Sequence, residues 1–234
     1  MNGDMRVVRE GFSDDTVRAL FEQNRLRGFA DLWHLEAAWV EAPNERRKGT
    51  SGVFRYPLEA GDGAIQPVFV KRQRNHNTKT CRHPIRGVPT FLREVAYIRK
   101  LRRAGIPVVD VWYYGQAISG GVQHAILVTR ALEGYVSLDQ WFALDENRSD
   151  EGRVRAVLRA VVDAVKPIHA RGIGHGSLYG KHIFVRAGAG GDAAGAAFDV
   201  CLIDLERARR SLFHDRMIRM DLSQLLRRTP GLGE

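Results

Sequence analysis

The spacing of apolar residues changes along this chain of 234 residues, and that change is what most limits its fold. In the first part, short apolar runs bounded by turn residues predict strands at 53–58, 68–71, 108–114 and 125–129. One helix interrupts them, because residues 91–105 carry apolar side chains at helical spacing. In the second part, 137–144 and 151–171 predict helices, the latter with a continuous apolar stripe. We therefore expect an α+β fold with a β-rich lobe over 1–133 and a mainly helical lobe over 134–234.

The segments between these elements are assigned from their turn-forming and charged residues. They are a helix at 14–30, a strand at 33–40, a glycine-rich turn at 44–52, a basic loop at 72–89, a flexible hairpin tip at 187–197, a buried strand at 199–203 and a final helix at 221–226. The strands before residue 72 follow one another through loops, which predicts an antiparallel meander.

The composition is that of a globular protein that needs no disulfide or metal to fold. Hydrophobic residues make up 44% and charged residues 27%, which is too apolar for a disordered chain. The two cysteines, Cys81 and Cys201, form no CxxC pair, which argues against a zinc ribbon and indicates a reducing compartment. No stretch reaches about 20 apolar residues, and the opening MNGDMRVVREGF has no apolar signal segment. We expect a cytoplasmic protein.

The charge is positive and unevenly distributed. The chain has 36 Lys and Arg against 27 Asp and Glu, a net charge of +9. Seven cations and no acid occur between residues 71 and 93: Lys71, Arg72, Arg74, Lys79, Arg82, Arg86 and Arg93. A second basic group, NERRKG, spans 44–49. This clustering favours a surface that faces an anionic partner, such as nucleic acid, an anionic membrane or a phosphorylated or carboxylated small molecule.

Lys71 and Glu94 form the first candidate pair. Lys71 ends the apolar run VFVK, and Glu94 lies in the helical segment that follows. Taken singly, a strand-end lysine and a helical glutamate are usually solvated. Taken together, they suggest a lysine that is held over phosphates and oriented by a carboxylate.

A second group of polar residues lies in HGSLYGKHIFV, residues 175–185, a loop that leads into an apolar strand. Two histidines, a lysine and a serine within eight residues indicate a site, although one histidine could be structural. Further along, Asp204 ends the buried run DVCLI. A carboxylate at that place is either a metal ligand or a capping residue, and the sequence leaves both open.

The order of the motifs in this chain resembles that of the protein-kinase-like fold. The motifs are VFVK, then a helical glutamate, then two histidines seven residues apart followed by IFV, and finally LID. The form HGSLYGKHIFV with LIDLERAR is similar to the bacterial lipopolysaccharide kinase family, which includes core heptose kinases and kinases of 3-deoxy-manno-octulosonic acid (Kdo). Within that family the chain looks most like the weak-acid-inducible, InaA-type branch. The resemblance covers about residues 30–226. It implies ATP and Mg²⁺ as cofactors and an anionic lipopolysaccharide core sugar as the acceptor.

The resemblance assigns nucleotide-binding roles in the first lobe. It implies that Lys71 holds the α- and β-phosphates of ATP and that Glu94 orients Lys71. It also implies that a turn containing Gly49, Ser51 and Gly52 covers the phosphates, with backbone N–H groups as donors.

In the second lobe, the resemblance implies that Asp204 binds Mg²⁺ and that His182 occupies the other metal-ligand position. An imidazole is a poorer ligand than oxygen for a hard ion, so His182 could instead contact phosphate or hold the loop. His175 would brace the loop, and Asp221 would support it from below. Lys181 joins His175 as a candidate catalytic residue of a loop that positions the acceptor.

The chain departs from the family at Ser177, which stands where the catalytic aspartate should be. Loss of a general base typically costs about 10²–10⁴-fold in rate, yet positioning and charge neutralisation dominate phosphoryl transfer. The chain is therefore either a weak phosphotransferase or a non-catalytic pseudokinase in an envelope or acid-stress response. A third alternative is a basic RNA-binding protein, but the cation clusters contain no RNA-binding motif and no interleaved aromatics, so we expect no nucleic-acid partner.

Two further expectations follow from the kinase interpretation. An exposed basic face could hold the chain peripherally against the anionic inner membrane. The Lys71 amine and the Asp204 carboxylate are expected to meet across a cleft between the two lobes.

Overall fold

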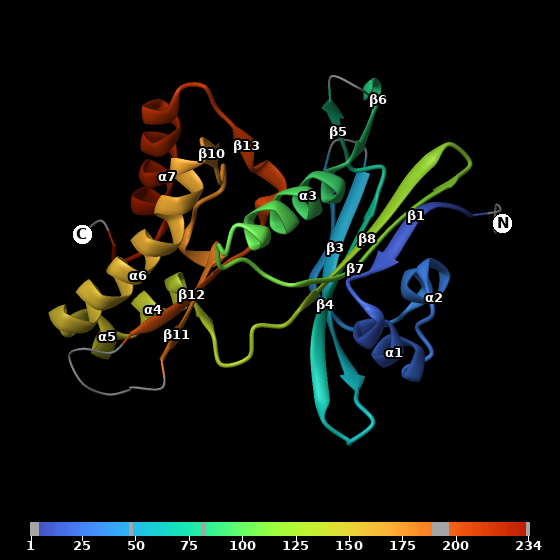
Figure 1. Ribbon diagram of the computed structural model, residues 1–234, viewed down its shortest axis with the longest axis horizontal. Helices are drawn as coiled ribbons and strands as arrows, with labels where there is room; N and C mark the ends of the chain where they lie inside the picture. Colours follow the sequence, from blue (N-terminus) through green and yellow to red (C-terminus); the bar gives the residue numbers. More distant parts are fainter. Residues whose placement is uncertain (1–4, 47–48, 81–82, 189–196, 233–234) are drawn as a thin grey trace. The chain divides into compact units, whose positions relative to one another are not determined.

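The computed structural model describes residues 5–46, 49–80, 83–188 and 197–232. The chain forms two compact units. The N-terminal unit comprises 1–96 and 110–131, and the C-terminal unit comprises 97–109 and 132–234 (Figure 1). Helix α3 (Thr90–Arg103) begins in the first unit and ends in the second. The division of the chain at residue 133 stays a prediction.

The N-terminal unit is built on a six-stranded antiparallel sheet with the order β1-β7-β8-β4-β3-β2 (Figure 1). Its strands are β1 (Arg6–Phe12), β2 (Trp39–Arg46), β3 (Gly49–Glu59), β4 (Ile65–Arg74), β7 (Val111–Ser119) and β8 (Val122–Arg130). A separate hairpin is formed by β5 (Asn77–Thr80) and β6 (His83–Pro89). The adjacent, antiparallel β2, β3 and β4 confirm the predicted meander.

Two short helices, α1 (Asp15–Gln23) and α2 (Phe29–His34), cover one face of this sheet (Figure 1). Alternation along β4 directs Val68 and Val70 toward the helices, and both are buried. They pack with Phe21 of α1 and Leu32 of α2 in one apolar cluster. Each such side chain contributes roughly 1.5–3 kcal/mol to stability when it is fully buried. The cluster therefore determines which face of β4 packs on the helices and which face is directed away from them.

Several sequence assignments in this unit are wrong in position or type. Residues 33–40 are helix end, connection and strand start rather than one strand. Most of the predicted turn at 44–52 lies in β2 and β3, and residues 47–48 lie outside the described residues. The predicted loop at 72–89 is the end of β4 followed by the β5–β6 hairpin. The sequence does not predict strand β1, because its side chains are largely exposed and it lacks an apolar run.

Arg72, counted in the basic segment, is not available to an external anion. Its guanidinium donates to the backbone oxygens of Trp33 and Leu35. It also lies over the rings of Trp39 and Phe54, with 4.5 Å between Cζ and the Phe54 centroid. Burial lowers the pKa of Arg72. Arg72 therefore joins β4 to the α2–β2 connection.

The C-terminal unit is mainly helical, with α4 (Leu138–Ala143), α5 (Asp145–Ser149), α6 (Glu151–Ala170) and α7 (His214–Arg228). Its strands are β9 (Val136–Ser137), β10 (Ile173–Gly174), β11 (Ile183–Ala187), β12 (Phe198–Leu202) and β13 (Arg209–Arg210). They pair as a β12-β11-β9 sheet and a β10-β13 ladder. Much of the stripe predicted on α6 is buried against β12, β10 and α7, although Val162, which belongs to the predicted stripe, is 54% exposed. Asp150 caps the helix by accepting from the Arg153 N–H at 3.0 Å.

The final helix and the hairpin tip differ from their assignments or lie partly outside the described residues. The final helix, α7, begins at His214, seven residues earlier than the predicted start at 221. Most of the predicted hairpin tip at 187–197 lies outside the described residues, although β11 and β12 pair antiparallel on either side of it. None of the helices in the described ranges is long and apolar enough to cross a membrane.

Candidate functional site

Lys71 and Glu94 form an ion pair in the N-terminal unit, with 2.7 Å between Nζ and Oε1. Lys71 lies on β4 next to Val70, so strand alternation directs it to the face opposite the core cluster. Glu94 lies on α3 among the buried residues of that helix. The Glu94 side chain is 1% exposed and that of Lys71 is 19% exposed. A carboxylate this deeply buried is costly unless it is paired, and Lys71 supplies a counter-charge.

The loop at 175–182 is tied to α7 through the buried carboxylate of Asp221. The Oδ2 atom accepts from the backbone N–H of His175 at 2.8 Å and contacts His169 Nε2 at 3.0 Å. The Oδ1 atom accepts from the Gly176 N–H at 2.9 Å. Burial alone would raise the pKa of Asp221, but these hydrogen bonds outweigh it and hold the pKa below its ordinary value. The support predicted for Asp221 is present, although Asp221 lies in the middle of α7 and not near its start.

The second end of the loop is held by residue 229, which directly follows α7. The Gly180 N–H donates to Thr229 Oγ1 at 3.0 Å. Sequence reasoning missed both Thr229 and His169. The one signal in the sequence is that each is a polar residue, His169 on an apolar helix face and Thr229 at a helix end. Periodicity does not reveal their partners, Asp221 and Gly180, because these are about 50 residues away in the sequence.

The His175 ring braces the end of β12. Its Nε2 lies 3.1 Å from the carbonyl oxygen of Ile203, so Nε2 carries the proton and donates. The other ring nitrogen, Nδ1, is buried and has no hydrogen-bond partner among the described residues. A second proton on Nδ1 would therefore have no acceptor. Burial is the main cause that lowers the pKa of His175 to about 4, and the Asp221 carboxylate opposes this shift.

This lowered pKa predicts that the free energy of unfolding falls as the pH falls from about 6.5 to about 4. In that window the unfolded chain binds a proton at His175 and the folded chain does not, so protons favour unfolding. The expected loss is roughly 3 kcal/mol, measured as urea midpoints across the window. His175→Gln should flatten the slope, whereas His34→Gln, at an exposed position, should leave it unchanged. An unchanged slope in His175→Gln would contradict the assignment.

His182 joins the loop to Asp204. Its Nδ1 lies 2.8 Å from the Ser177 carbonyl oxygen, and its Nε2 lies 3.1 Å from Asp204 Oδ2. The Asp204 side chain is 28% exposed, so the carboxylate stays accessible. Asp204 also has a left-handed backbone (φ 59°, ψ 60°), which is uncommon outside glycine and recurs at functional sites. The structure thus brings together His175, Ser177, His182 and Asp204.

The donor set suits a hard cation only in part. Across the described ranges, no group of three or more His, Cys, Asp or Glu side chains could hold a metal by itself. Mg²⁺ commonly takes one or two protein carboxylates and completes its shell with phosphate oxygens and water. Asp204 fits that pattern, whereas His182 is engaged with Ser177 and Asp204. Lys181 is exposed on the 3₁₀ turn Gly180–His182.

Gly49, Ser51 and Gly52 lie in β3, and Ser51 pairs with Gln73 of β4. The expectation of a turn at these positions is wrong. A Cβ at Gly49 would lie 2.6 Å from the backbone of Asn75, and one at Gly52 would lie 2.6 Å from the Trp39 ring. Packing within the sheet therefore explains both glycines. Their role in covering phosphates stays a prediction, as does the meeting of Lys71 with Asp204.

The fold defines the class to which the chain belongs. A solved structure described as WaaP in complex with acyl carrier protein matches with a TM-score of 0.64, covering 93% of this chain and 80% of that chain at 22% identity. This likeness confirms the predicted kinase-like fold.

The sequence identifies the family within that class. Residues 30–233 match the lipopolysaccharide kinase (Kdo/WaaP) family, and the chain belongs to it. The chain is also 36% identical over 200 residues to Protein InaA of Escherichia coli (strain K12), which covers 84% of this chain and 86% of that protein. The resemblance inferred from the motifs is thus confirmed, including its InaA-type branch.

Proposed function

We propose that the chain is an ATP-dependent phosphotransferase that acts on a hydroxyl group of a lipopolysaccharide core sugar. The observation that carries the proposal is the buried 2.7 Å ion pair between Lys71 and Glu94 in a chain of the lipopolysaccharide kinase family. The pair fixes an ammonium group whose side chain is still 19% exposed, as a phosphate-binding lysine requires. A cytoplasmic location, with contact to the anionic inner membrane, belongs to the same proposal.

The proposal assigns roles to the side chains around Lys71, Asp204 and Asp221. ATP would supply the phosphoryl group, and Mg²⁺ would neutralise the charge on its phosphates. Lys71 binds phosphate oxygens, and Glu94 holds Lys71 in place. Asp204 offers its accessible carboxylate to the metal, and His182 orients that carboxylate. Asp221 fixes the backbone of the loop, so that Ser177 and its neighbours are positioned before an acceptor binds.

Asp204→Asn tests this function. The amide removes one negative charge and keeps the shape of the side chain, so we expect Mg·ATP binding to weaken by at least about tenfold. The measurement is calorimetric titration with Mg·ATP, followed by transfer to purified core oligosaccharide. Asp199→Asn, at a surface ion pair with Arg186, is the matched control and should change neither quantity. Equal Mg·ATP affinity in Asp204→Asn and the wild type would reject the role of Asp204.

The second candidate is a nucleotide-binding pseudokinase, and the observation that favours it is Ser177 itself. The Ser177 residue is only 3% exposed, and it offers a hydroxyl where the family has a carboxylate.

Ser177→Asp distinguishes the two candidates. If the wild type is a weak enzyme, the added base raises the rate of transfer by about 10²–10⁴-fold. The measurement is phosphate transfer to core oligosaccharide, compared with Ser177→Asn, which adds similar volume without a base. Transfer that is absent in the wild type and present in Ser177→Asp would assign the natural chain to the pseudokinases and reject the enzymatic proposal.

A further inference from the structure

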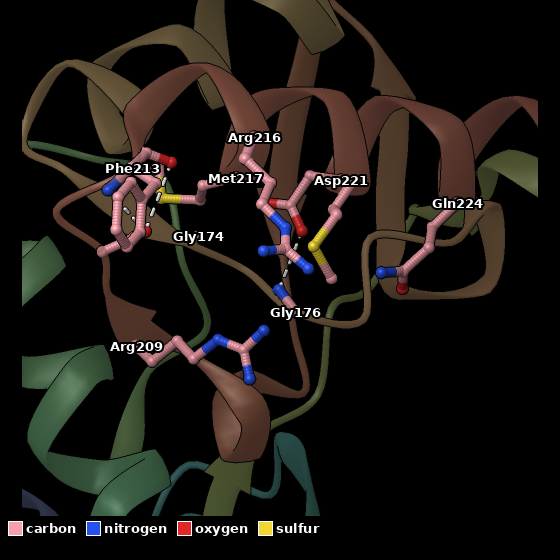
Figure 2. Close-up of a pocket in the computed structure, with 10 residues that line it drawn as sticks. Gly174, Gly176, Arg209, Phe213, Arg216, Met217, Asp221 and Gln224 are labelled. Atoms are coloured by element: carbon pink, nitrogen blue, oxygen red, sulfur yellow. Dashed lines mark hydrogen bonds between the residues drawn. The ribbon is translucent and has the colours of Figure 1, made fainter.

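The C-terminal unit contains a cavity on the side of the loop where Asp221 holds it. Its volume is about 250 Å³, and it is formed by the β10–β13 ladder, the segment after β13 and α7 (Figure 2). The lining residues are Gly174, Gly176, Arg209, Ser211, Phe213, Arg216, Met217, Met220, Asp221 and Gln224. Ser177, Asp204 and the Lys71–Glu94 pair do not line it. Among the residues given a role in phosphoryl transfer, Asp221, which fixes the loop, is the one that lines the cavity.

The cavity has an excess of positive charge. Arg209 and Arg216 direct their guanidinium groups toward the space beside Gly176 (Figure 2). In the part of the chain that the structure describes, neither side chain takes part in an ion pair or hydrogen bond. The one acid in the lining is Asp221, and both of its oxygens already accept hydrogen bonds from His169 and from the loop backbone. Both arginines are exposed, and two guanidinium groups beside one space can together contact an anion with several oxygens, such as a phosphate group.

Where the loop lines the cavity at Gly176, it presents backbone and no side chain. Gly176 has a φ of +78°, and a Cβ there would lie 2.6 Å from the Arg207 carbonyl oxygen. A side chain at position 176 would therefore be strained and would meet Arg207, which explains the glycine at this place in the cavity wall. The Gly176 N–H is already used by Asp221, so the arginines supply the anion contacts.

The remaining walls indicate what carries the phosphate. Gln224 lines the cavity, and its Oε1 is buried without a hydrogen-bond partner among the described residues, so it can accept from a hydroxyl group of a ligand. Phe213, Met217 and Met220 add apolar surface. A volume of about 250 Å³ is below the range of about 300–1,000 Å³ typical of drug-sized ligands. A monosaccharide phosphate offers all three features: a phosphate group, hydroxyl groups and a small apolar face.

We propose that this cavity is a binding site for a monosaccharide phosphate, with Arg209 and Arg216 on the phosphate and Gln224 on a hydroxyl group. The site does not depend on phosphoryl transfer by the chain. Its occupant contacts Gly174 and Gly176, which flank His175, so binding stabilises the hydrogen bonds that hold the loop on Asp221. The site thus connects a sugar phosphate to the conformation of the loop that carries Ser177.

Calorimetric titration of the full chain at constant ionic strength tests the site with three probes: glucose 6-phosphate, inorganic phosphate and glucose. We expect glucose 6-phosphate to bind more tightly than phosphate and glucose not to bind. Arg209→Gln and Arg216→Gln should each weaken glucose 6-phosphate by about tenfold or more. Gln224→Leu should reduce the preference for glucose 6-phosphate over phosphate. Hydrogen exchange should slow in residues 173–177 when glucose 6-phosphate is bound.

Two control variants distinguish binding in this cavity from binding elsewhere on the chain. Arg219→Gln removes an exposed cation of α7 that does not line the cavity, and it should leave the affinity unchanged. Lys79→Met removes an exposed cation of the N-terminal unit and should also leave the affinity unchanged. Equal weakening by Arg219→Gln or by Lys79→Met, or no binding of any probe, would overturn the site. Equal affinities for phosphate and glucose 6-phosphate would overturn the sugar part of the proposal.

Discussion

Replacing Asp221 by alanine is expected to lower the free energy of unfolding by roughly 3–5 kcal/mol, because it removes a buried charge that satisfies several partners. The carboxylate accepts from the backbone N–H groups of His175 and Gly176 and contacts His169 Nε2, all at 2.8–3.0 Å. His175 is 1% exposed and His169 is 7% exposed, so both are largely shielded from water that could replace the carboxylate. Each buried donor that is left without a partner costs about 1–3 kcal/mol.

The measurement is urea denaturation of the full chain together with hydrogen exchange. The exchange of the His175 and Gly176 amides should become faster even in variants that still fold, because their acceptor is gone. Asp163→Ala is the matched control: it removes an exposed aspartate from α6 and should change the free energy of unfolding by no more than about 0.5 kcal/mol. If Asp221→Ala matched this control, Asp221 would not hold the loop.

The sequence predicts those elements of the fold whose burial leaves a pattern in neighbouring residues. The α6 stripe and the buried run of β4 are visible as periodicity, because burial on one face repeats along a helix or a strand. Strand β1 is held by pairing with β7, which is distant in the sequence, and its own side chains give no apolar pattern. The sequence of the β5–β6 hairpin indicates a loop instead, because Pro84, Pro89 and the cations around them are typical of turns.

In the candidate site, too, local signals are visible in the sequence and long-range contacts are not. The family order of motifs predicts Lys71 and Glu94 as a pair, and the structure brings their charges together. The bridge from His182 to Asp204 and the contact from His169 to Asp221 depend on tertiary packing, which no spacing rule contains. Arg72 is the clearest case: a run of cations predicts a solvated basic face, yet aromatic rings and two carbonyl groups take this guanidinium into the fold. Charge counts therefore overstate the surface that is available to an anion.

The Lys71–Glu94 pair allows stability and nucleotide binding to be separated. Lys71→Met leaves the Glu94 carboxylate, 1% exposed, without the ammonium group, and we expect the free energy of unfolding to fall by about 3 kcal/mol. Adding Glu94→Gln neutralises the buried charge and should recover most of that loss, because breaking one side of a buried pair costs more than replacing both sides. Mg·ATP affinity should stay at least about tenfold lower in both variants, since neither has the phosphate-binding amine.

Urea denaturation and Mg·ATP calorimetry on the two variants and the wild type complete this test. Lys79→Met removes an exposed cation from β5 in the same basic segment and should change neither stability nor affinity, which excludes an effect of net charge. A double variant that stays as unstable as Lys71→Met would show that the two side chains are not energetically coupled. A double variant that binds Mg·ATP like the wild type would show that Lys71 supports the fold alone, and the nucleotide would then have to be held by other residues.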